Sequence, residues 1–208
     1  MLEKLPDAVG HALRNLRAGL DQIACNQSGL RSGMAAIQVA SLAFADHAPI
    51  PARYTADGEG SSPPLHWSGV PAGAASLVLI VEDADSPTPH PLVQAIAVDL
   101  PPADGSLPEG AITGSGDQAQ DVHEGRNSSL MAGWLPPDPP PGHGTHRYAF
   151  QLFALGPGEP FEGTPGRDEV MDAVRERALA SGCLIGTYER PDGSIKSGEG
   201  QPATPAAA

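Results

Sequence analysis

The stretch Ser76–Asp83 (SLVLIVED) carries the clearest structural signal in this chain of 208 residues. Its nearly continuous run of branched aliphatic residues has the length and composition of a strand that is buried on both faces of a sheet. Two further stretches have the same character, Val93–Leu100 (VQAIAVDL) and Arg147–Leu155 (RYAFQLFAL). We therefore expect these three segments to be neighbouring strands of one sheet.

Weaker strand patterns flank these three segments. Polar and apolar residues alternate over Ile37–Phe44, and Cys183–Tyr188 (CLIGTY) is a short apolar run. Gly and Pro are frequent in 45–74, and 101–145 is a long irregular stretch of a length that is usually functional or disordered. Many strands joined by turn-rich loops, with few helices, predict a mainly β fold, an antiparallel β-sandwich with few peripheral helices.

Helical periodicity occurs in two places. In Asp168–Ser181, Val170 and Val174 share one face, Asp168 is placed to begin the helix and Gly182 to end it. The first 30 residues carry a second apolar stripe at helical spacing, so that we expect an N-terminal helical extension. The stripe consists of Leu2, Val9, Leu13, Leu16, Leu20 and Ile23.

These patterns divide the chain into an amphipathic helix and linker over 1–36, a β domain over 37–191 and a disordered tail over 192–208. The N-terminal stripe has to be buried, because an isolated helix of this length is marginal in water. It could pack on the outside of its own domain or against a second copy of the chain. Both alternatives stay open, and we lean towards a homodimer, since two-fold dimers are the commonest homo-oligomers.

Charge and composition exclude several classes of partner. The net charge is −13, from 12 Lys and Arg against 25 Asp and Glu, so the chain offers few contacts to nucleic acid or to anionic headgroups. The N-terminus has no signal-peptide pattern, and no apolar run is long enough to span a membrane. We expect a cytoplasmic protein without integral membrane association. Cys25 and Cys183 form no metal or redox motif, and two reduced thiols are the simplest interpretation.

Polar and titratable residues gather where strands begin or end, in Glu82–Pro87 (EDADSP), His90–Gln94 (HPLVQ) and Gly142–Tyr148 (GHGTHRY). Each residue alone has a plain structural interpretation, such as an aspartate in a turn or a histidine at a strand end. If the strands are neighbours, however, a carboxylate, an imidazole and a phenol converge on one small site. Such a set can bind a phosphate or a carboxylate, with the imidazole, the phenol and glycine N–H groups as donors.

Several motifs, in this order and spacing, resemble those of the phosphatidylethanolamine-binding proteins, in particular their bacterial Raf-kinase-inhibitor-like branch. The motifs are SPPLHWSGVP (62–71), VEDADSP (81–87), GRNS (125–128), PPPGHGTHRY (139–148) and LIGTYERP (184–191). The resemblance covers roughly residues 37–191. It implies a β-sandwich with a small anion pocket at one end, phosphate-bearing or acetate-like ligands, no metal or other cofactor, and in eukaryotic relatives the inhibition or scaffolding of kinases.

Matched motif by motif, the family's pocket residues fall on Asp83, Asp85, Pro87, His146 and Tyr148 of this sequence. Gly144 leads into the histidine and tyrosine, and its backbone would face the ligand.

One pocket position departs from the family pattern. Where the family commonly has a histidine entering the strand, this chain has Gln94, which can donate a hydrogen bond but cannot be protonated. His90, four residues earlier, would substitute only if its loop folded inward, so that we place Gln94 in the pocket ahead of His90.

The favoured function is therefore non-enzymatic binding of a small anion or of a phosphorylated partner protein. The alternative is a metal-dependent hydrolase in which Asp83, Asp85, His90 and His146 hold a divalent cation. A serine hydrolase lacks support, because the sequence contains no G-x-S-x-G motif.

Overall fold

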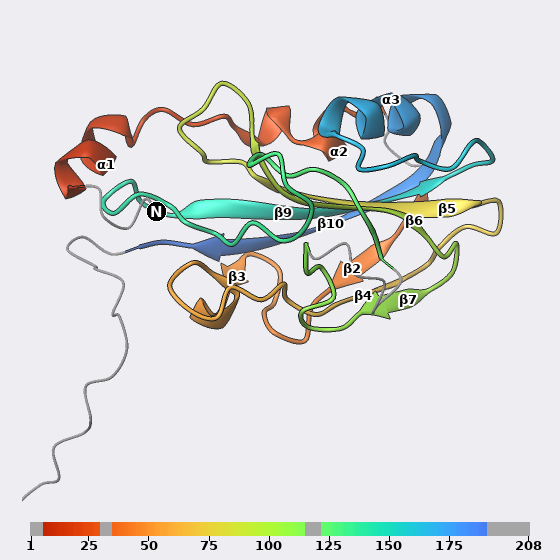
Figure 1. The fold of residues 1–208 in the computed structure, drawn as a ribbon, viewed down its shortest axis with the longest axis horizontal. Helices are drawn as coiled ribbons and strands as arrows, with labels where there is room; N and C mark the ends of the chain where they lie inside the picture. The colour runs from red at the N-terminus through yellow and green to blue at the C-terminus, as the bar shows by residue number, and fades with distance from the viewer. Residues whose placement is uncertain (1–5, 30–34, 115–121, 191–208) are drawn as a thin grey trace, which may run out of the picture.

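The computed structural model describes residues 6–29, 35–114 and 122–190. Its described part consists of a larger β-sheet, a smaller sheet on one face of it, and helices on the other face (Figure 1). We call the face towards the smaller sheet the inner face and the face towards the helices the outer face. None of the described helices has the length and apolar character needed to cross a membrane.

The larger sheet confirms the prediction of three central neighbouring strands. Strand β5 (Ser76–Asp83) lies between β6 (Leu92–Leu100) and β9 (His146–Leu155), and both pairings are antiparallel. On the far side of β9 lies β10 (Ala178–Tyr188), also antiparallel. Three two-residue strands complete the sheet. Strands β1 (Ala35–Ala36) and β3 (Ala48–Pro49) both pair with β10 in parallel. Strand β8 (His123–Glu124) pairs with β6.

The smaller sheet is antiparallel and contains β2 (Gln38–Ala40), β4 (Leu65–Ser68) and β7 (Gly105–Leu107). A short 3₁₀ helix, η3 (Ala52–Tyr54), lies between β3 and β4 in the chain. The single strand expected over Ile37–Phe44 is wrong, because the chain leaves the larger sheet after β1 and enters the smaller one at β2. The buried Ile37 lies at this crossing and contributes to the core between the sheets.

The uninterrupted apolar run of β5 is explained by burial of both its faces. Leu77, Leu79 and Val81 point inward and pack in the core between the two sheets. Val78 and Ile80 point outward and pack beneath the helices. A strand with one solvated face would alternate apolar and polar residues, as β4 does.

The C-terminal helix is shorter than predicted. Helix α3 spans Arg167–Arg177 with Gly166 at its N-cap, so that Asp168 lies inside the first turn. Residues 178–181, predicted as helix, instead begin β10, because pairing with β9 satisfies their backbone groups. Gly182 is a strand residue rather than a helix stop, and a Cβ there would lie 2.0 Å from the carbonyl oxygen of Ile37.

The N-terminal segment is not one continuous helix. It contains α1 (Asp7–Leu13), the 3₁₀ helix η2 (Leu20–Gln22) and the single turn α2 (Ala24–Gln27). Helix α1 ends at Leu13, and the chain reaches η2 through Gly19, whose φ of +99° lies outside the helical region. We call residues 6–29 the N-terminal arm.

The predicted apolar stripe is correspondingly dispersed. Leu16 is 54% exposed, whereas Ile23 is 3% exposed and packs against Ala84, Ala149 and Ile185 of its own domain. The arm also bonds to the backbone after β5, since Gly19 N–H donates to the carbonyl of Ala84 at 2.7 Å. The arm thus packs on its own domain, and the homodimer stays a prediction.

Candidate functional site

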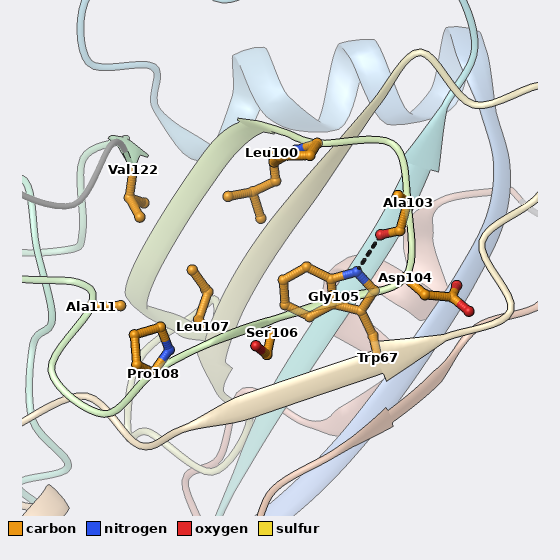
Figure 2. A pocket seen from close by; sticks show the side chains of 11 residues that line it. Trp67, Leu100, Ala103, Asp104, Gly105, Ser106, Leu107, Pro108, Ala111 and Val122 are labelled. Carbon is orange, nitrogen blue, oxygen red and sulfur yellow. Dashed lines mark hydrogen bonds between the residues drawn. The ribbon is translucent and has the colours of Figure 1, made fainter.

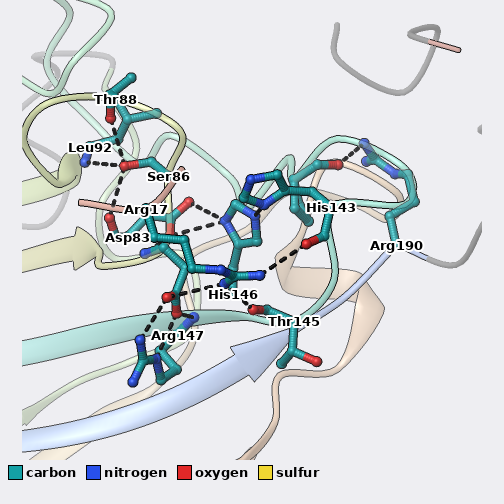
Figure 3. Close-up of polar contacts among 12 residues, drawn as sticks. Arg17, Asp83, Ser86, Thr88, Leu92, His143, Thr145, His146, Arg147 and Arg190 are labelled. Atoms are coloured by element: carbon teal, nitrogen blue, oxygen red, sulfur yellow. Dashed lines mark hydrogen bonds and ion pairs between the residues drawn. The ribbon is translucent and has the colours of Figure 1, made fainter. Parts of the chain in front are cut away.

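The centre of the candidate site is a buried pair formed by Asp83 and His146. Asp83 is the last residue of β5 and His146 the first of β9, and these antiparallel neighbours bring the two ends together. The Nδ1 atom of His146 lies 2.8 Å from Oδ2 of Asp83 and 3.1 Å from Oδ1 (Figure 3). The side chains are 1% and 6% exposed, so that solvent screens their interaction little.

A second histidine continues this chain of hydrogen bonds. Nδ1 of His143 lies 2.7 Å from Nε2 of His146, and Nε2 of His143 lies 2.9 Å from the carbonyl oxygen of Leu13 in the N-terminal arm. Since a carbonyl only accepts, His143 Nε2 carries a hydrogen. Burial, the neighbouring His146 and Arg17 lower the pKa of His143, which favours its neutral form and leaves Nδ1 as an acceptor.

With these roles, both ring nitrogens of His146 are hydrogen-bonded. Its Nε2 donates to the neutral His143, and its Nδ1 shares a proton with the carboxylate of Asp83. His146 therefore presents Nε2 as a donor on the side of its ring away from Asp83.

Tyr148 lies beside this pair. It is opposite Asp83 in the β5–β9 ladder, and its ring stacks on that of His146, with centroids 6.3 Å apart. Burial, and next the charge of Asp83, raise the pKa of Tyr148 well above its usual value, so that it keeps its proton. Its hydroxyl is buried and has no hydrogen-bond partner within the described ranges. A buried hydroxyl without a partner is costly and indicates a place where a ligand or water binds.

Gln94 occupies an irregular position in β6. The β5–β6 ladder pairs Val93 with Glu82 and Ala95 with Val81, so that Gln94 is the extra residue of a β-bulge. Bulges redirect side chains and occur often beside functional sites. The side chain of Gln94 is buried, and its Oε1 atom also has no partner among the residues described.

Asp85 is part of a clamp rather than a free ligand. Arg147 holds it in a bidentate bond, with Nε 2.6 Å from Oδ2 and Nη2 2.6 Å from Oδ1, and Arg17 approaches Oδ1 at 3.1 Å. Burial opposes ionisation of Asp85, but the hydrogen bonds from Arg147 and Arg17 outweigh burial and lower its pKa. Asp85 is therefore a carboxylate that positions the loop after β5.

The N-terminal arm covers this end of the sheet. Arg17 donates to the carbonyls of His143 at 2.9 Å and Thr145 at 2.8 Å, which fixes the loop before β9 (Figure 3). A Cβ atom on Gly10 of α1 would lie 1.9 Å from the carbonyl oxygen of Pro141, so that α1 rests directly on the same loop. Sequence reasoning gave His143, Arg17 and this cover no role.

Buried Arg190 holds the other side of this loop. Its guanidinium bonds to Asp57 and Asp138 at 2.7 and 2.8 Å, and it donates to the carbonyl of Pro139 at 2.8 Å. The proline-rich segment that carries His143 is therefore held both by Arg190 and by the N-terminal arm.

The remaining predicted residues lie at the margin. Pro87 is half-buried and His90 is exposed, and the backbone carbonyl of His90 accepts a hydrogen bond from the Thr88 hydroxyl. Gly144 adopts a φ of +91° in the loop before β9.

The four residues of the hydrolase alternative are not assembled as a metal site. Asp85 is engaged by two guanidinium groups, His90 faces solvent, and no group of three or more His, Cys, Asp or Glu in the described ranges could hold a metal ion.

A separate apolar cavity of about 510 Å³ lies beside the smaller sheet and contains none of the predicted site residues. Figure 2 shows the indole of Trp67 in its wall, with its Nε1–H bonded to the carbonyl of Ala103 at 3.0 Å. Leu100, Leu107 and Pro108 supply further apolar lining.

Comparison with known proteins gives a consistent result. Residues 40–189 match the family described as phosphatidylethanolamine-binding protein. A UPF0098 protein of Methanothermobacter thermautotrophicus is 38% identical over 148 residues, which is 71% of this chain and 95% of that protein. This chain belongs to the phosphatidylethanolamine-binding protein family, as its motifs predicted.

Solved structures support the same assignment. A phosphatidylethanolamine-binding protein homologue of Chlamydia trachomatis has 36% sequence identity and a TM-score of 0.67, covering 74% of this chain and 98% of its own. YbcL of Escherichia coli, described as a member of the mammalian family, has 27% identity and a TM-score of 0.69, covering 75% and 99%.

Proposed function

We propose that this protein binds a small anion or a phosphate-bearing group at Asp83, His146 and Tyr148, without catalysing a reaction. The observation that carries the proposal is the buried hydroxyl of Tyr148, which has no hydrogen-bond partner among the described residues and whose ring stacks on that of His146. Membership of the phosphatidylethanolamine-binding protein family supports ligand binding in general.

The chemistry of the site favours an anion. A phosphate or carboxylate oxygen could accept from Tyr148 Oη–H and take the place of His143 Nδ1 as acceptor for His146 Nε2–H. Gln94 and the backbone of Gly144 are the further groups that we propose for the pocket, with Asp85 and Pro87 shaping its loop. His90 would join it only after a rearrangement of the loop, because its side chain faces solvent.

The test is a titration with inorganic phosphate and with O-phosphoethanolamine, followed through the ring NMR signals of His143 and His146. Removal of the Tyr148 hydroxyl in Tyr148→Phe should weaken binding about tenfold or more, since a hydrogen bond to a charged group contributes about 1.5–3 kcal/mol. Tyr54→Phe is the matched control, because it removes a hydroxyl that bonds to Glu109 elsewhere. Equal affinity of wild type and Tyr148→Phe, or no response to either ligand, would overturn the proposal.

The same sample distinguishes binding from hydrolysis. Stoichiometric retention of a divalent metal, or turnover of a phosphoester that is lost in Tyr148→Phe, would contradict the non-enzymatic function. Our proposal expects the two anions to be recovered unchanged.

The proposal also includes a kinase-inhibitor-like interaction with a partner protein, a homodimer and a cytoplasmic location. Because the arm packs on its own domain, burial of a free apolar stripe no longer supports the dimer. Light scattering on the full chain tests the homodimer. A phosphoserine peptide used as a competitor of phosphate tests whether the same site accepts a phosphorylated protein.

A further inference from the structure

The fold brings together the two cysteines of the sequence, Cys25 and Cys183, which are far apart in the chain. Cys183 is directly opposite Gln151 in the β9–β10 ladder, so that their side chains share the outer face of the sheet. Cys25 lies in α2 of the N-terminal arm, and its backbone N–H donates to Oε1 of that same Gln151 at 2.7 Å. The register and this bond place both cysteines beside one glutamine.

The position of Cys25 is fixed by buried polar contacts. The preceding Ala24 N–H donates to Oε2 of Glu82 at 2.7 Å, and Gln151 Nε2 donates to the same oxygen at 2.8 Å. Arg167 bonds the other carboxylate oxygen of Glu82 at 2.6 Å and also the carbonyl of Gln22 in the arm at 2.9 Å. The turn that carries Cys25 is thus held on the outer face before any covalent bond forms.

The two thiols differ in accessibility. Both are free, with Cys183 exposed and Cys25 half-buried. A side-chain hydrogen bond with Cys183, and next burial, raise the pKa of Cys25. Cys183 is therefore the thiol that meets an oxidant from solvent, and Cys25 is the neighbour whose side chain already contacts it.

We propose that Cys25 and Cys183 are a redox pair, which a hydroperoxide oxidises to an intramolecular disulfide. The thiolate of Cys183 attacks the O–O bond, which gives a sulfenic acid at Cys183 and releases an alcohol or water. The sulfur of Cys25 then attacks the sulfenic sulfur, the S–S bond forms, and the hydroxyl leaves as water with the Cys25 proton. Two thiols lose two electrons, and the peroxide is reduced.

The disulfide would fasten the N-terminal arm to β10. Cys25 follows Arg17 by eight residues, and Arg17 holds the loop that carries His143. In the reduced protein hydrogen bonds and packing alone hold the arm, whereas in the oxidised protein a covalent link joins α2 to the sheet. This inference stands independently of anion binding, because neither cysteine belongs to the anion site.

The experiment treats the full chain with a small excess of hydrogen peroxide and maps peptides by mass spectrometry without reduction. We expect one species, in which the peptides of Cys25 and Cys183 are joined and two hydrogens are lost. Reduction should restore both thiols. Amide exchange of Ala24 and Cys25 should slow several-fold on oxidation, and the thermal midpoint should rise by several degrees, since the cross-link restricts the unfolded chain.

The matched variant is Cys183→Ser, which changes an exposed side chain and leaves the buried contacts of the arm in place. It should show no cross-linked peptide and no change of midpoint or amide exchange with peroxide. If the wild-type thiols remain separately alkylatable, or if cross-links form only between chains, the proposal is wrong. The same conclusion follows if Cys183→Ser gains as much thermal stability on oxidation as the wild type.

Discussion

Lowering the pH should destabilise this protein through His143. The ring is fully buried, donates from Nε2 to the Leu13 carbonyl and accepts at Nδ1 from His146. Burial, and next the neighbouring His146 and Arg17, lower the pKa of His143. Protonation would also place two N–H groups against each other at 2.7 Å. The folded state therefore resists a proton that the unfolded state accepts near pH 6.5.

The sign and size of the effect follow from this difference in bound protons. Between the lowered folded pKa and about 6.5, the unfolded chain binds one more proton, so that stability falls as the pH falls. At one pH unit below the unfolded pKa, the loss from this residue is about 1.4 kcal/mol while folded His143 stays neutral. The loss disappears above about pH 7.5, where neither state is protonated.

The assay is urea unfolding followed by tryptophan fluorescence at several pH values between 8 and 5. The informative variant is His143→Gln, since a glutamine amide can donate to Leu13 and accept from His146 but does not titrate. Its stability should fall less steeply with decreasing pH than that of the wild type. His66→Gln is the control, because it removes an exposed histidine of β4. Parallel pH profiles of wild type and His143→Gln would refute the reasoning.

Three further predictions concern stability. Glu82→Ala leaves Arg167 and two N–H donors without their buried carboxylate and should cost about 3–5 kcal/mol in urea unfolding. Gly10→Ala should push α1 off the Pro141 loop and cost about 1–3 kcal/mol, with faster amide exchange in the arm. Above about pH 10 the unfolded chain loses a tyrosine proton that folded Tyr148 retains, so that stability should fall with rising pH, and less so in Tyr148→Phe.

Matched controls separate these effects from general damage. Glu169→Ala removes an exposed carboxylate of α3 and should stay within about 0.5 kcal/mol of the wild type. Gly73→Ala adds a methyl group whose nearest neighbour, Leu179 Cδ1, is 3.6 Å away, and should not change exchange in the arm. If Glu82→Ala is as stable as Glu169→Ala, the buried carboxylate does not anchor the arm.

The central strands could be predicted from sequence, because burial of both faces leaves a continuous apolar run that local reading detects. The C-terminal end of helix α3 could not be predicted from sequence. Residues 178–181 (ALAS) suit a helix as well as a strand, and the ladder with β9 decides between them. Whether these residues form a helix or a strand depends on a partner strand that is distant in the chain, and local propensity carries no information about that partner.

In the candidate site, too, some contacts could be predicted from the sequence and others could not. The pairing of Asp83 with His146 follows from their places at the ends of adjacent strands. The contacts of His143 and Arg17 join residues more than 120 positions apart, and no strand pattern links the arm to that loop. A local signal against one continuous helix did exist, since Gly19 lies inside the predicted apolar stripe, although α1 already ends at Leu13.

The edge of the larger sheet at β10 has a consequence for self-association. Along this edge the chain supplies its own partners, because Ile37, His47 and Ile50 donate backbone hydrogen bonds to Ser181, Ile185 and Thr187. At the opposite edge, β8 is only two residues long. Within the described ranges, neither edge offers a long row of unpaired backbone groups onto which another copy could add a strand, so that fibril growth by edge addition is disfavoured. Any homodimer of this protein should therefore use side chains of the helical layer or of the smaller sheet, and not a continuous intermolecular β-ladder.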